Sequence, residues 1–473
     1  MSTNLRRVLM AAAAFSLAGC TVGPDYVRPA APAPAAYKEL PANKPAQPAD
    51  TVPRGAWWKA YGDPQLDTLQ QEVIAANQTL RVAEANYRQA RAAVRASRAE
   101  LFPGVGVSIG GTRARAANSR GGGTASALTA AGDVTWEVDL WGGIRRGVEA
   151  SESSAQSSAA TLASTELSLQ SELAQNYLQL RVADAVKRVL QDTVEAYERS
   201  MTLTQNRYNA GVVARADVVQ AQTQLLSAQA NLIDIANTRA QFEHAIAALV
   251  GKAPAELSIA EQQAVPDVPT VPVGVPSELL ERRPDVAAAE RRVAAANAQI
   301  GVATAAIYPS LTLSAGGGFV GSSLADWISL PNRFWSLGAS LAGTVFDGGL
   351  RTAQRDQTLA AYDAAVAQYR QTVLDAFRDV EDQLAAIRIL EDEARVQAEA
   401  LRFARESVAL TTNQYKAGLV GFLNVVTVQA VALQAERNSV ELAGRRFSAT
   451  IALIKALGGG WRSTEAPLAG AAN

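Results

Sequence analysis

The sequence has 473 residues, of which 48% are apolar, and it balances 44 Lys and Arg against 45 Asp and Glu. The apolar fraction permits a buried core, whereas the charge balance argues against nucleic acid as a partner, which would require a basic excess. Aromatic residues make up only 6%, and Ala, Gln, Leu and Val dominate. This composition suits long helices that pack closely through small residues.

Residues 1–19 have the features of an export signal peptide. Arg6 and Arg7 precede a short apolar stretch, and Leu17-Ala-Gly-Cys20 has the form of a lipobox. The stretch is too short to span a membrane as a helix. Because Cys20 is the only cysteine, the pattern favours its lipidation over a buried free thiol, and no disulfide can form within the chain. Thr21 is compatible with transfer to the outer membrane.

Residues 20–55 are rich in Pro and Ala. Such a composition predicts an extended segment without a core of its own. We interpret it as the tether between the lipid and the folded part.

Three unlike motifs recur in the same order at an offset of 206 or 207 residues, which indicates a duplicated structural unit. The pairs are Leu101-Phe-Pro103 with Ile307-Tyr-Pro309, Gly142-Gly-Ile-Arg145 with Gly348-Gly-Leu-Arg351, and Tyr208-Asn-Ala-Gly211 with Tyr415-Lys-Ala-Gly418. We therefore expect a first repeat at 56–255 and a second at 276–458. A linker at 256–275 joins them, and a tail at 459–473 follows.

Within each repeat, a β-hairpin is predicted at about 104–140 and 310–346. Apolar and small polar residues alternate there, as in Val105, Val107 and Ile109. Polar, Gly-rich loops are expected from Thr112 to Thr129 and from Gly321 to Asn332. Strands of about ten residues can cross a bilayer, although alternation alone also fits a soluble sheet. Four strands cannot close a barrel, and hydrocarbon does not tolerate open sheet edges, so the membrane interpretation requires several chains to share one barrel.

Each hairpin precedes a long helical segment, because no proline occurs from Gly104 to Ala253 or from Asn332 to Ala466. Apolar residues follow a 4-3 spacing typical of a coiled coil in both segments. They are Leu190, Val194, Tyr197, Met201, Thr204 and Tyr208, and then Val373, Phe377, Val380, Leu384 and Ile387. The first helix would be about 100 Å long. Gly211 and Gly418 fit the left-handed backbone that ends a helix, so the hairpin tips are expected at about 208–217 and 415–424.

These features together resemble the outer-membrane factors of tripartite efflux systems, most closely the lipid-anchored, NodT-type branch of the TolC-like family. The residues that carry the resemblance are the lipobox, Ala56-Trp57-Trp58 through Asp63-Pro64-Gln-Leu66, both copies of Tyr-x-Ala-Gly, Leu279-Leu-Glu-Arg-Arg-Pro284-Asp-Val286, and Lys455-Ala-Leu-Gly-Gly-Gly460-Trp461. The resemblance covers essentially the whole chain.

The resemblance implies an α+β membrane protein. Three chains would form a periplasmic α-helical barrel continuous with a twelve-stranded outer-membrane β-barrel, with four strands from each chain. An equatorial region would include 56–70, the link near 251–275 and the C-terminal end. The implied function is a passive exit duct for drugs or other small toxic compounds. Its partners would be two further copies of the chain, a periplasmic adaptor protein, an inner-membrane RND-type transporter and outer-membrane lipid.

By the same resemblance, the duct narrows near the second hairpin tip. The candidate gate residues are Asp217, Leu423, Asn424 and Thr427. Thr427 stands where some family members have Asp, which makes a strong cation-attracting ring doubtful. Asp217 and Asn424 also fit a simpler role as helix caps. The candidate adaptor contacts are Arg207, Tyr208, Gly211, Arg215, Tyr415 and Gly418.

The sequence offers little for catalysis or cofactor binding. His244 is the only histidine, and only three methionines occur. We therefore expect no enzyme activity, no cofactor and no metal site. Two other functions fit the sequence: an outer-membrane duct of a protein secretion system, and a structural coiled-coil lipoprotein without a pore.

Overall fold

The computed structural model describes residues 21–32, 34, 36–39, 56–115, 123–262, 268–269, 282–325 and 327–459. The predicted signal peptide, Cys20, most of the expected linker and nearly all of the tail lie outside these residues. The chain divides into two compact units. Unit 1 comprises residues 1–30, 85–159 and 288–371, and unit 2 comprises 31–84, 160–287 and 372–473.

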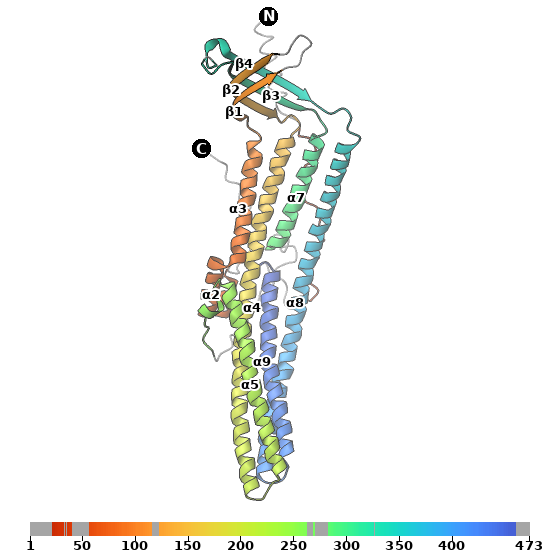
Figure 1. Cartoon of the computed structure of the whole chain (residues 1–473). Coiled ribbons are helices and arrows are strands. Elements are labelled where there is room, and N and C mark those ends of the chain that lie inside the picture. Colours follow the sequence, from red (N-terminus) through yellow and green to blue (C-terminus); the bar gives the residue numbers. More distant parts are fainter. Residues whose placement is uncertain are drawn as a thin grey trace. The chain divides into compact units, whose positions relative to one another are not determined.

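The long helices repeat in length as well as in sequence (Figure 1). The helices α4 (Gly143–Asn209) and α8 (Leu350–Lys416) each have 67 residues, and α5 (Arg215–Leu249) and α9 (Phe422–Ala456) each have 35. A helix of 67 residues is about 100 Å long. The prediction of two rod-length helices is therefore confirmed.

Shorter helices complete the helical part. They are η1 (Trp57–Tyr61), α2 (Pro64–Ala76), α3 (Gln78–Ala99), η2 (Pro254–Glu256), α7 (Pro284–Ala305) and η4 (Leu330–Asn332). Asp63 caps α2 by accepting hydrogen bonds from the amides of Gln65 and Leu66, and Pro64 occupies the first turn, where its missing N–H costs nothing. Within the described ranges, none of the helices combines the length and apolar character needed to cross a membrane.

Unit 1 contains an antiparallel sheet in the order β1-β2-β3-β4. The strands are β1 (Gly104–Arg115), β2 (Thr124–Val138), β3 (Ser310–Gly321) and β4 (Arg333–Ala342). The predicted loop from Thr112 to Thr129 is wrong in extent, because the first hairpin pairs without a break as far as Arg115 and Thr124. Backbone hydrogen bonds do not require apolar side chains, so small polar residues continue this ladder. Likewise, β4 stops at Ala342, before the predicted end of the second hairpin at about 346.

Segment 21–30 lies against the helices of unit 1. The amide of Val22 donates to the carbonyl of Trp141 at 3.0 Å. The buried side chain of Arg146 pairs with Asp25 at 2.7 Å, and the Asn297 amide donates to the Pro24 carbonyl at 2.9 Å. The segment is thus extended, as its composition predicts. Side chains of the helices, Arg146 and Asn297, hold it in place.

The helices of unit 2 pack in pairs along the predicted seams. In the first pair, Val194 and Tyr197 of α4 contact Ala228 of α5. In the second, Ala404 of α8 contacts Ala432 and Ala435 of α9. The seam prediction is confirmed, except that Tyr208 at its end is exposed. Each pair ends at a turn, which contains Gly211 in the first pair and Gly418 in the second.

A buried ionic network fixes another part of unit 2. Arg181 lies 3.0 Å from Asp184, which also pairs with Arg239 at 2.7 Å, and the side chains of Arg181 and Asp184 are almost fully buried. Arg181 and Arg239 also donate to the backbone carbonyls of Ala260 and Ile259. The network therefore holds the segment around Ile259 and Ala260 against α4 and α5.

Candidate functional site

One face of the sheet is apolar and exposed. Strand register places the alternating residues of each strand on the same face. Six large apolar residues on this face are between 65% and 81% exposed: Val105, Val107, Ile109, Trp335, Leu337 and Leu341. Others on the same face, such as Val134, Trp136 and Phe319, are partly buried. Exposed apolar surface of this extent suits contact with lipid hydrocarbon.

The opposite face carries mostly small and polar residues, with Val320 and Phe334 as larger apolar exceptions. It carries Ser108 on β1, Asp133 and Glu137 on β2, and Ser336 on β4. Gly106 leaves room for Asp133, because a Cβ there would lie 2.9 Å from both carboxylate oxygens. A sheet with one apolar and one polar face can separate hydrocarbon from water.

Both outer strands of this sheet have an open edge. In the described chain, β1 pairs only with β2, and β4 pairs only with β3. Their outward backbone N–H and C=O groups therefore lack ladder partners. In hydrocarbon each such group would cost several kcal/mol. The outward edges of β1 and β4 are therefore both available for backbone pairing.

Two equivalent turns connect the long helices of unit 2. Gly211 and Gly418 have φ values of 73° and 76°. The amides of Gly211 and Val212 donate to the carbonyls of Tyr208 and Arg207, and Gly418 and Leu419 repeat this pattern. Since a Cβ on Gly211 would meet no atom within 4 Å, the left-handed backbone and not crowding explains the glycine. The predicted conformation of both turns is confirmed.

Arg207 joins the two tips. Its guanidinium donates to the carbonyls of Tyr415 and Lys416 and lies 4.5 Å from the centre of the Tyr415 ring. Tyr415 is only 2% exposed and packs against Phe422 at a centroid distance of 5.6 Å. Among the predicted adaptor contacts, the Tyr415 ring is therefore buried within the tip. Tyr208 and Arg215 lie at the surface.

The candidate gate residues lie in the first two turns of α5 and α9. Asp217 is half-buried, and Leu423, Asn424 and Thr427 are exposed. The capping interpretation of Asp217 and Asn424 is wrong. The N-cap positions are Ala214 and Gly421, and no side chain makes a capping hydrogen bond at either helix start. The helices begin earlier than the polar residues suggest.

Two exposed apolar stripes in unit 2 were not predicted. In each stripe, an apolar residue recurs every seven positions, and this spacing can be read from the sequence. The first stripe comprises Val212 of the turn with Val219, Leu226 and Ile233 of α5, and the α8 stripe comprises Ile389, Val396, Phe403 and Leu410. All eight side chains are more than half exposed. A row of exposed apolar side chains at a spacing of seven lies along one side of a helix, where a second helix can pack on it.

No group of three or more His, Cys, Asp or Glu residues that could hold a metal ion occurs in the part of the chain that the structure describes.

Comparisons with known proteins agree with this geometry. The model of the outer membrane efflux protein family matches residues 69–252 and 275–459, in two segments that correspond to the internal repeat. The pyoverdine export outer membrane protein OpmQ of Pseudomonas aeruginosa is 31% identical over 98% of this chain and 99% of its own. The toluene efflux pump outer membrane protein TtgC of Pseudomonas putida is 30% identical over 96% and 95%. The solved outer-membrane channel OprN superposes with a TM-score of 0.88 at 31% identity, over 93% of this chain and all of that one.

Proposed function

The chain belongs to the family of outer membrane efflux proteins, and we propose that three copies of it form one exit duct for small toxic organic compounds. A pump in the inner membrane would drive export, and a periplasmic adaptor would connect the pump to the duct. The toluene and pyoverdine named in two relatives support a small organic cargo. The gate and adaptor contacts would lie at the hairpin tips, and Cys20 would carry the lipid anchor.

The observation that carries this proposal is the open sheet with an exposed apolar face. Two edges without partners make a single chain unsuitable for hydrocarbon, whereas pairing β4 of one copy with β1 of the next would satisfy both edges. Three such pairings would close a twelve-stranded wall.

The internal repeat indicates which helices would meet between copies. Within one chain, α4 packs on α9: a Cβ on Gly444 would lie 3.2 Å from Val182 Cγ2, and Gln179 donates to the Gly444 carbonyl. The equivalent positions, offset by 207 residues, are Ile389 of α8 and Asn237 of α5. Val182 is 6% exposed, but Ile389 is 53% exposed. The face of α8 around Ile389 therefore has no helix packed on it among the described residues, unlike the matching face of α4.

We therefore place α8 of one copy antiparallel to α5 of the next. The pairing of α4 with α9, shifted by 207 residues, gives the register of α8 against α5. In this register, large side chains lie opposite small ones in successive layers. The layers are Val396 with Ala230, Ala400 with Leu226, Phe403 with Thr223, Ser407 with Val219, and Leu410 with Ala216. Alternation of large and small residues allows two helices to interdigitate closely. The two exposed stripes would be buried together.

Disulfide trapping tests this arrangement. Paired Ala230→Cys and Val396→Cys substitutions should cross-link neighbouring chains into dimers and trimers on a non-reducing gel, because a disulfide requires Cα atoms within about 7 Å. A matched control pairs Ala230→Cys with Leu410→Cys, which lies about 21 Å further along the same face of α8. Equal cross-linking by both pairs, or cross-links within one chain, would contradict the register.

The duct itself is tested by conductance in planar bilayers. The reconstituted parent protein should conduct ions, and the Ala230→Cys, Val396→Cys variant should still conduct when cross-linked, because the bond lies in the wall. A purified protein that stays oligomeric but never conducts, even with the tips destabilised, would instead indicate a structural lipoprotein.

A further inference from the structure

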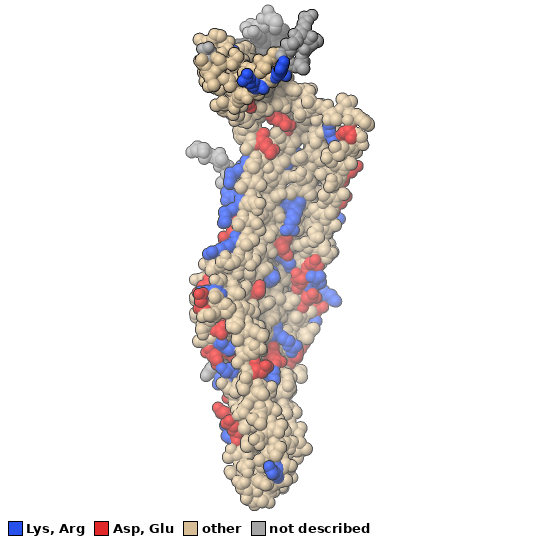
Figure 2. Space-filling model, in the orientation of Figure 1, with Lys and Arg blue, Asp and Glu red and all other residues tan. Residues whose placement is uncertain are grey.

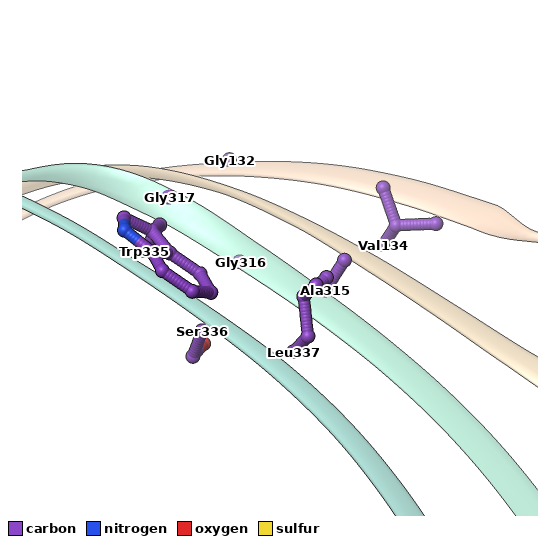
Figure 3. Close-up of a pocket in the computed structure, with 8 residues that line it drawn as sticks. All are labelled: Gly132, Val134, Ala315, Gly316, Gly317, Trp335, Ser336 and Leu337. Atoms are coloured by element: carbon purple, nitrogen blue, oxygen red, sulfur yellow. The ribbon is translucent and has the colours of Figure 1, made fainter. Parts of the chain in front are cut away.

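The apolar face of the sheet contains a shallow trough beside an exposed tryptophan (Figure 3). Val107, Gly132, Gly317 and Trp335 form one row across the four strands, with two glycines between larger side chains. The next row adds Val134, Ala315 and Leu337, which line the same groove. The floor of the trough is therefore backbone, and its walls are apolar.

The backbone does not require these two glycines. Neither has a positive φ. A Cβ on Gly132 would approach nothing closer than the Gly106 carbonyl at 3.8 Å, and one on Gly317 would find the Phe334 carbonyl at 3.4 Å, an ordinary contact. Gly318 differs, because a Cβ there would lie 2.1 Å from the Ala130 carbonyl. Packing within the chain thus explains Gly318, whereas Gly132 and Gly317 leave space that the chain does not use.

A cation marks one end of the trough. Arg333 is exposed and lies on the same face as Trp335, two residues earlier on β4. It has no ion-pair partner among the described residues. The four strands contain only two other basic residues, Arg113 and Arg115, also on the apolar face near the same end of the sheet. The carboxylates of the sheet, Asp133 and Glu137, lie on the opposite face. Figure 2 shows basic groups over this part of the molecule.

We propose that this site binds a membrane lipid with a phosphate-bearing headgroup. The phosphate would pair with Arg333, whose planar guanidinium can donate two hydrogen bonds to phosphate oxygens. One acyl chain would lie over Gly317 and Gly132, between Trp335 and Val107. The row from Arg333 to Leu341 spans nine residues, about 27 Å along the strand, which is the length of a tilted strand that crosses a bilayer. Arg333 is therefore at headgroup level on the side of the hairpin loops. This inference rests on the proposed function, because it requires the sheet to face lipid.

Native mass spectrometry of the full chain in non-ionic detergent can count bound lipid, with phosphatidic acid as the phosphate-bearing probe and phosphatidylcholine as its comparison. The parent should prefer phosphatidic acid. Arg333→Gln should reduce this preference about fivefold, the effect of one cation at an anionic membrane surface. Gly317→Leu should fill the trough and weaken binding of both lipids. In vesicles with dibrominated chains, Gly317→Leu should also reduce the part of the tryptophan quenching that is lost when Trp335 is replaced by Phe.

The matched controls separate this site from general effects. Gly110→Leu adds the same side chain to the polar face, where a Cβ meets nothing within 4 Å, and Arg88→Gln removes an exposed cation from α3. Neither should change lipid selectivity. Equal lipid selectivity in the parent and in Arg333→Gln would overturn the phosphate contact, and unchanged binding in Gly317→Leu would overturn the trough. If conductance persists in either case, the duct stands and only the lipid site falls.

Discussion

The contact between Arg207 and the second hairpin tip leads to a quantitative prediction for gating. Replacing Arg207 with Ala removes a charged donor from the carbonyls of Tyr415 and Lys416 and a cation from the face of the Tyr415 ring. Hydrogen bonds from charged groups contribute about 1.5–3 kcal/mol, and an exposed cation–π contact about 0.5–1 kcal/mol. Because Arg207 is half-buried, we expect about 2–3 kcal/mol for each chain.

If the tips form the gate, this loss should favour the open state about 30- to 150-fold per chain, since 1.4 kcal/mol corresponds to a factor of ten. The assay is the open fraction of single channels in planar bilayers. Arg207→Lys should have an intermediate effect, because a lysine keeps the charge but cannot reproduce the planar set of donors.

Arg199→Ala provides the control, because it removes another arginine from α4. Its side chain is 71% exposed and, among the described residues, pairs with Glu195 one turn away. Its open fraction should equal that of the parent. If Arg207→Ala were indistinguishable from Arg199→Ala, the contact between the tips would not restrain the gate, and the reasoning would fail.

Four further predictions concern stability, charge and anchoring. Asp184→Asn should destabilise the chain by about 3–5 kcal/mol in denaturant unfolding, because it leaves Arg181 and Arg239 without their shared counter-charge; an unchanged midpoint would contradict this. Burial raises the pKa of Glu166, so the folded state holds its proton more tightly than the unfolded state, and stability falls as pH rises through the raised pKa. Glu166→Gln should therefore raise the melting temperature at pH 7 but have little effect in acid, and a lower melting temperature at pH 7 would refute this. Thr427→Asp should increase the preference for cations in reversal-potential measurements if Thr427 lines the aperture, whereas unchanged selectivity would remove it from the aperture. Cys20→Ser should abolish palmitate labelling yet leave the protein in the membrane, because one acyl chain adds little affinity beside a membrane-spanning barrel; persistent labelling would refute the lipobox.

The sequence predicts the repeated architecture well because its signals are local. Gly211 and Gly418 end long helices, and the 4-3 spacing through Val194 and Tyr197 identifies a seam whatever its partner. The family match in two segments agrees with the duplication. Local patterns are sufficient for features, such as a helix end or a seam, that one helix determines by itself.

Contacts between distant segments were not predictable in the same way. Arg146 fixes a proline-rich segment more than a hundred residues away in sequence, and Arg207 binds backbone carbonyls, which no side-chain pattern reveals. The capping role expected for Asp217 was wrong because an alanine and not a polar residue occupies the cap of α5. The apolar stripe on α8 was visible as a heptad, but its exposure appears only when the rest of unit 2 is in place.

Electron cryo-microscopy of the purified protein in detergent tests the central claim most directly. The account predicts three chains around a single barrel, with β4 of each chain hydrogen-bonded to β1 of its neighbour and α8 packed on the neighbouring α5. A particle with one chain, or with three separate four-stranded sheets, would contradict it.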